Sequence, residues 1–167
     1  MDDRIGRKFS NLKERKQAAL ICYMVAGFPD LKMSEAVIET LVSAGADMIE
    51  IGIPFSDPIA DGPLIQQASH HALTHGVRPQ QCFELAGATR KIFPDLPLIF
   101  MTYSNILYRT GFEDFMYKAR ASGIDGFILP DMSIEESEEY IKISRELGLA
   151  SVFIVSPNTK DNRARRI

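Results

Sequence analysis

Three acidic residues, Glu50, Asp57 and Asp61, fall within one short stretch of this sequence. Glu50 interrupts the apolar run 48–53, which has the length of a buried strand, and the two aspartates follow in a loop stiffened by prolines and a glycine. An ionised carboxylate is costly to bury among apolar side chains unless it is paired, hydrogen-bonded or kept protonated. Carboxylates in two such different surroundings suit general acid–base chemistry. The stretch therefore predicts an acid–base site.

The elements that must position these acids alternate along the chain. Strand-like apolar runs occupy 19–26, 48–53, 98–103, 126–129 and 151–155. Amphipathic runs with helical spacing lie at 6–16, 33–44, 64–74, 79–92, 112–122 and 133–147, the last starting at Ser133 with Glu136 as a capping box. This alternation predicts an α/β fold, a parallel sheet covered by helices, in a single domain over residues 1–167. Periodicity leaves both an open sheet and a barrel possible, although no nucleotide-binding glycine loop follows the first strand.

Composition limits the partners. The chain is 46% hydrophobic with a net charge of −3, which gives no reason to expect nucleic acid or a membrane surface. The N-terminus lacks a signal-peptide core, and Cys22 and Cys82 have no metal-type spacing, so we expect free thiols in a cytoplasmic protein. His71 and His75 lie one helical turn apart, but no third ligand accompanies them, so no metal site is predicted.

The stretch 50–66, with the sequence EIGIPFSDPIADGPLIQ, resembles the second-strand signature of the tryptophan synthase α subunit family. Further similarities follow in the same order, at 26–30, 101–105, 123–131 and 156–159. The resemblance implies a TIM (β/α)8 barrel, of which this chain covers about strands 1–5.

The resemblance also implies an activity, the aldol cleavage of indole-3-glycerol phosphate to indole and glyceraldehyde 3-phosphate in tryptophan biosynthesis. Glu50 would move the proton at indole C3, and Asp61 would take the proton of the indole nitrogen. From the residues alone, a structural ion pair at Glu50 and a helix N-terminal acid at Asp61 stay open. An apolar slot for the indole is expected from four residues near strand ends, Tyr23, Met101, Tyr103 and Ile128.

No cofactor is expected for this chain, because in the family pyridoxal phosphate belongs to the β subunit, the implied partner in an α2β2 tetramer. The resemblance places a β-subunit contact at Pro54, Asp57, Pro58 and Asn105, although an ordinary turn explains Asp57 equally well. In the family the substrate phosphate is bound by loops that correspond to positions after Ile167. Two alternatives therefore stay open: a truncated, non-catalytic fragment that keeps the docking surface, and a phosphate-handling barrel with different chemistry.

Overall fold

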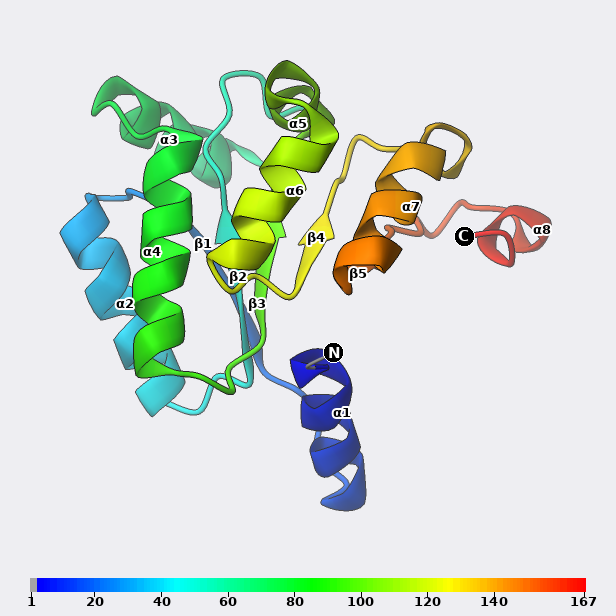
Figure 1. Cartoon of the computed structure of the whole chain (residues 1–167), viewed down its shortest axis with the longest axis horizontal. Helices are drawn as coiled ribbons and strands as arrows, with labels where there is room; N and C mark the ends of the chain where they lie inside the picture. Colours follow the sequence, from blue (N-terminus) through cyan, green and yellow to red (C-terminus); the bar gives the residue numbers. More distant parts are fainter. Residues whose placement is uncertain (1–2) are drawn as a thin grey trace.

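The computed structural model describes residues 3–167, and a parallel sheet forms its centre. Five strands pair in sequence order: β1 (Ile21–Val25), β2 (Met48–Gly52), β3 (Leu98–Met101), β4 (Gly126–Ile128) and β5 (Ala150–Val152). A helical segment follows each strand, and Figure 1 shows helices α2 (Leu31–Ser43), α4 (Pro79–Ile92), α6 (Phe112–Ala121) and α7 (Glu138–Leu147) side by side over one face. Helix α3 (Pro63–Thr74) follows the acidic loop, α1 (Arg4–Glu14) lies at the foot of the sheet, and α8 (Asp161–Ala164) ends the chain.

Both faces of the sheet are apolar, as is usual for parallel strands. The helix-facing side chains join the main core; examples are Ile49, Ile51 and Phe100. The opposite face, which we call the inner face, carries a smaller cluster of Met48, Ile99 and Ile128, with Met101 and Ile5 of α1 packed against it. Because side chains alternate along a strand, Glu50 lies between Met48 and Gly52 on this inner face.

The sheet is open within residues 3–167. Strand β1 pairs with β2 alone and β5 with β4 alone, so each leaves one edge without a partner. Large apolar side chains are exposed in or beside these edge strands, at Leu20, Ile21, Val152 and Ile154. None of the helices in this part of the chain is long and apolar enough to cross a membrane.

Two local features differ from the sequence predictions. Helix α5 (Ser104–Thr110) was not expected; its first residue is held by Asp131, a partner that lies far away in the sequence. The helix expected over 133–147 is divided into a short 3-10 turn, η1 (Ile134–Glu136), and α7. The capping box at Ser133 was wrong, because its hydroxyl donates to the Glu136 carboxylate at 2.6 Å and makes no cap bond to the backbone.

Candidate active site

Glu50 lies in the middle of β2 on the inner face. The register places it opposite Tyr23 of β1 and Ile99 of β3, and its side chain is half-buried. Burial among these residues raises the pKa of the Glu50 carboxyl, because the charged form loses solvation. The direction is the one expected of a proton donor, and no cation pairs with Glu50 in the described chain.

Asp61 lies in the loop 53–62, between β2 and α3, and is tied to the end of β3. The hydroxyl of Tyr103 donates to Asp61 Oδ2 at 3.1 Å, and the same hydroxyl accepts the backbone N–H of Ala60 at 3.0 Å. The Tyr103 ring stacks on Phe55, with centroids 5.1 Å apart. Tyr103 therefore holds the loop at both of its ends.

Burial raises the pKa of the Asp61 carboxyl, and the hydrogen bond from Tyr103 opposes that rise because it stabilises the ionised form. Burial raises the pKa of Tyr103 itself to about 12, with the Ala60 bond opposing and the charge of Asp61 adding to the rise. Tyr103 thus stays a neutral donor. We had predicted it as a wall of the slot, and the structure gives it the additional task of holding Asp61.

The other residues predicted to form the indole slot lie on the inner face. Met101 and Ile128 are register partners on β3 and β4. Tyr23 leans over β2, since a Cβ on Gly52 would come within 2.3 Å of its hydroxyl oxygen, so a glycine is needed there. Burial, followed by the negative charge of Asp61, raises the pKa of Tyr23. Tyr23 and Glu50 lie opposite each other in the middle of β1 and β2, whereas Tyr103 and Asp61 lie in the segments that follow β3 and β2. The charge of Asp61 acts on both tyrosines, so the four groups lie close together.

The four residues predicted to contact a partner subunit differ in exposure. Asp57 and Asn105 are exposed, whereas Pro54 and Pro58 are buried within this chain and contribute chiefly to the shape of the loop. Pro54 and Asn105 both line a hollow of about 980 Å³ on the outer side of the loop.

Asp131 ends the stretch 123–131, and the sequence predicted no role for it. The structure supplies one. Its carboxylate accepts the backbone N–H of Ser104 at 3.0 Å and the Ser104 hydroxyl at 2.6 Å. This pairing fixes the start of α5 immediately after Tyr103, and hence the position of the Tyr103 ring. An acid directly after the fourth strand was the only signal for it in the sequence.

The histidines of α3 have structural partners. His71 Nε2 lies 2.9 Å from the carbonyl oxygen of Pro29, and the His71 ring stacks on His75 with centroids 4.1 Å apart. No group of three or more potential metal ligands is found among residues 3–167.

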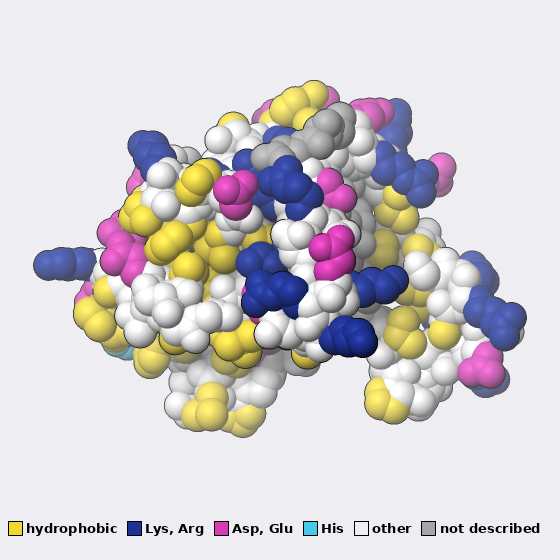
Figure 2. All heavy atoms as spheres, turned by 90° about the horizontal axis from the view of Figure 1, so that it is seen from below, with side chains coloured by type: hydrophobic (Ala, Val, Ile, Leu, Met, Phe, Trp, Pro, Cys, Tyr) yellow, Lys and Arg dark blue, Asp and Glu magenta, His cyan; other side chains and the backbone are white. Residues whose placement is uncertain are grey.

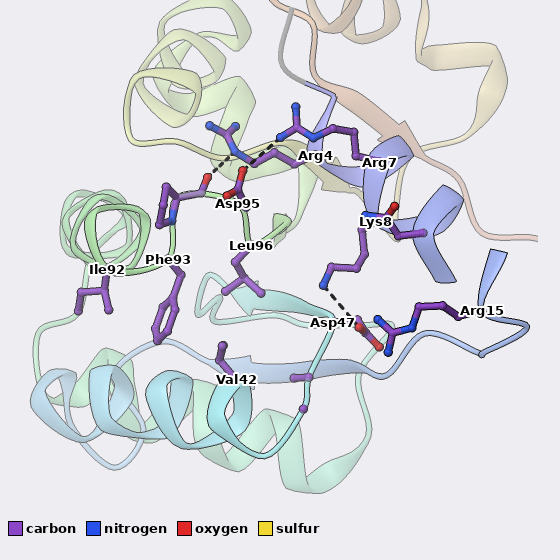
Figure 3. A pocket seen from close by; sticks show the side chains of 14 residues that line it. Arg4, Arg7, Lys8, Arg15, Val42, Asp47, Ile92, Phe93, Asp95 and Leu96 are labelled. Atoms are coloured by element: carbon purple, nitrogen blue, oxygen red, sulfur yellow. Dashed lines mark hydrogen bonds and ion pairs between the residues drawn. The ribbon is translucent and has the colours of Figure 1, made fainter. Parts of the chain in front are cut away.

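A second hollow, of about 740 Å³, lies at the opposite end of the strands, between α1 and the loops that enter β2 and β3. Figure 2 views the molecule from this end, where Lys and Arg side chains gather beside apolar ones. Figure 3 shows partners for three of these cations: Arg4 donates to the carbonyl of Pro94, Arg7 pairs with Asp95, and Lys8 with Asp47.

Behind this hollow, the carboxylate of Asp125 binds Arg4 and Arg90, both at 2.8 Å, and accepts the Leu98 N–H at 2.9 Å. Asp125 is only 5% exposed. The arrangement clamps α1 and α4 to the sheet, which is a structural task.

Successive parallel βα units whose strands pair in sequence order, with helices over one face of the sheet, are typical of (β/α)8 barrels. Within that class the family is shown by sequence. The family model described as "Tryptophan synthase alpha chain" matches residues 9–167, and the chain belongs to this family.

Three relatives illustrate the similarity. The tryptophan synthase alpha chain of Aquifex aeolicus is 42% identical over 164 residues, which are 98% of this chain and 63% of the relative. The crystal structure of the subunit alpha from Legionella pneumophila superposes with a TM-score of 0.96 at 34% identity, over 99% of this chain and 63% of that one. A crystal structure of a tryptophan synthase complex from Pyrococcus furiosus superposes with a TM-score of 0.86 at 39% identity. The match covers 90% of this chain and 62% of that one. The chain thus spans less than two thirds of the length of these relatives. Its five strands correspond to the part of the family's barrel that the match covers.

Proposed function

We propose that this chain carries the acid–base machinery of an indole-3-glycerol-phosphate lyase of tryptophan biosynthesis, acting in the cytoplasm. One observation supports this above the others: Glu50 on the inner face of β2 and Asp61 on the loop that follows β2 both lie near Tyr23, in different surroundings. Burial raises the pKa of both carboxyls, and at Asp61 alone a hydrogen bond from Tyr103 opposes the rise because it favours the ionised form.

The reaction divides into proton transfers that these two carboxyls serve. Protonated Glu50 adds a proton to indole C3 while Asp61 accepts the proton of the ring nitrogen. The glycerol hydroxyl then gives its proton to Glu50 as the C–C bond breaks, the electrons of that bond return to the ring, and Asp61 restores the nitrogen proton. In total, the hydroxyl proton has moved to indole C3, and both carboxyls are regenerated. No cofactor is needed for these steps.

The aromatic and apolar residues would then hold the ring. Tyr23, Met101 and Ile128 form a surface on the inner face against which an indole would lie, and Tyr103 keeps Asp61 at its edge. The partner we propose is the pyridoxal-phosphate β subunit, which would consume the indole. Its docking surface would include Asp57 and Asn105, with Pro54 and Pro58 shaping the loop behind them.

A chimera tests the proposal: residues 1–167 joined to the remaining segment of the Aquifex aeolicus relative, assayed for release of glyceraldehyde 3-phosphate with a coupled dehydrogenase. We expect turnover, and Glu50→Gln should lower it by about 10²–10⁴-fold without loss of fold. Turnover that Glu50→Gln leaves unchanged would remove Glu50 from the mechanism.

A second candidate function is a docking module without catalysis. It is favoured by the completeness of the docking surface, because the loop 53–62 and α5 lie wholly within a chain that spans only 62% of the Pyrococcus furiosus chain. Binding of the β subunit by residues 1–167, together with an inactive chimera, would select this candidate over the lyase.

A further inference from the structure

The hollow on the outer side of the loop 53–62 has features that the proposed chemistry does not use. We call it the loop hollow. It has a volume of about 980 Å³ and lies between the loop, the turn that joins α3 to α4, and helix α5. It is lined by Pro54, Phe55, Ser56, Leu73, Val77, Arg78, Pro79, Asn105, Ile106, Arg109 and Thr110.

The loop hollow is positively charged. Arg78 and Arg109 line it, and no Asp or Glu is among its lining residues. Arg109 is exposed and makes no hydrogen bond or ion pair with any described residue. The guanidinium of Arg78 donates to the carbonyl of Val77 at 3.0 Å and has no carboxylate partner in the same part of the chain.

This differs from the arginines at the other end of the sheet. There Arg4 and Arg90 share the buried carboxylate of Asp125, and Arg7 pairs with Asp95. Those three arginines are paired with carboxylates inside the chain, whereas Arg78 and Arg109 have no carboxylate partner among the described residues and line one hollow together. An arginine fork matches a carboxylate with two parallel hydrogen bonds, which makes a carboxylate the best-fitting anion.

The rest of the lining is largely apolar. Half-buried Leu73 and Ile106 face the same hollow as Pro54, and Phe55 is fixed there by its stack on Tyr103. Apolar walls with cations at the edge suit a protein segment that inserts an apolar side chain and carries an acid beside it. Asn105 also lines the hollow, so it is continuous with the docking surface of the proposed function.

We propose that the loop hollow receives a segment of the β subunit that presents a carboxylate to Arg78 and Arg109 beside an inserted apolar side chain. This inference rests on the proposed function for the identity of the partner, and adds the chemistry by which the partner is recognised. Complementary charge of this kind chiefly speeds association and rejects wrong partners.

Calorimetric titration of the 167-residue chain with the β subunit from the same organism tests the inference. The variants are Arg78→Gln, Arg109→Gln and both together. Arg145→Gln on α7 is the matched control, because it removes the same charge from an exposed arginine outside the loop hollow. Circular dichroism verifies that every variant keeps the fold.

We expect the double variant to bind at least about 10-fold more weakly, the single variants to fall between, and Arg145→Gln to match the unmodified chain. The difference should shrink in 0.5 M NaCl, because salt screens exposed charges. Arg109→Lys should retain more affinity than Arg109→Gln, since it keeps the charge and loses only the fork.

Three outcomes would overturn the inference. If the unmodified chain binds the β subunit and the double variant binds equally well, the loop hollow takes no carboxylate from that partner, while the proposed function stands. If the unmodified chain does not bind at all, the partner assignment fails together with this inference. If the arginine variants alter self-association of the chain in gel filtration but not β-subunit binding, the occupant is a second copy.

Discussion

The bond from Tyr103 to Asp61 carries a prediction that the 167-residue chain itself can test. Tyr103→Phe keeps the ring that stacks on Phe55 and removes the hydroxyl alone. Two hydrogen bonds are lost, one to the Asp61 carboxylate at 3.1 Å and one from the Ala60 N–H at 3.0 Å. The loop 53–62 then loses the two bonds that hold residues 60 and 61, while the Phe55 stack and the bond from the Ile53 N–H to the Met101 carbonyl remain.

The two bonds differ in strength. A neutral hydrogen bond such as that of Ala60 contributes about 0.5–1.5 kcal/mol net, so amide exchange at Ala60 should speed up by roughly 2- to 10-fold. A bond to a charged group contributes about 1.5–3 kcal/mol, and the lower end applies because Asp61 is only partly buried. In a catalytically complete chain, turnover that depends on ionised Asp61 should therefore fall about 10-fold.

Hydrogen exchange followed by NMR measures the exchange rate of the Ala60 amide. A carbon-13 titration measures the pKa of the Asp61 carboxyl. Because the Tyr103 bond lowers the pKa of Asp61, its loss should raise that pKa. Tyr108→Phe is the control, since Tyr108 is an exposed tyrosine of α5 whose hydroxyl makes no hydrogen bond in the described chain. Unchanged exchange at Ala60 together with an unchanged Asp61 titration would refute the reasoning.

Further predictions concern the two carboxyls Glu50 and Asp61, the carboxylate of Asp125 and the free strand edges. Glu50→Gln should lower turnover of a catalytically complete chain by about 10²–10⁴-fold. Asp61→Asn should lower turnover and leave substrate binding largely intact. An equal loss of binding and turnover for Asp61→Asn would indicate a structural role. Because burial raises the Glu50 pKa, the stability of the folded chain should decline as pH rises through that pKa. In urea denaturation, Glu50→Gln should be more stable than the unmodified chain at neutral pH and equally stable below about pH 4, where both side chains are neutral. Asp125→Ala should cost about 3–5 kcal/mol in the same assay, because it leaves Arg4 and Arg90 (15% and 13% exposed) without their carboxylate, and a loss below 1 kcal/mol would contradict the clamp. The isolated 167-residue chain should self-associate through the free edges of β1 and β5 and bind indole-3-glycerol phosphate poorly; a monomer in gel filtration that cleaves the substrate would contradict this.

The sequence by itself determined the order and type of most elements. Short continuous apolar runs and amphipathic helical runs are local properties, and they placed all five strands and most of the helices close to where they lie. Helix α5 was missed because its start depends on Asp131, and neighbouring residues carry no trace of that bond.

Only the tertiary structure decided how the site is assembled. The bond between Tyr103 and Asp61 spans 42 positions in the sequence, and that between Ser104 and Asp131 spans 27. Gly52 gives no local signal that its missing side chain makes room for Tyr23 of the neighbouring strand. Nor does the sequence distinguish Arg90, which is buried against Asp125, from Arg109, which has no partner in the described chain. Backbone propensity and side-chain period act over a few residues, whereas these contacts depend on which strands lie side by side once the parallel sheet has formed.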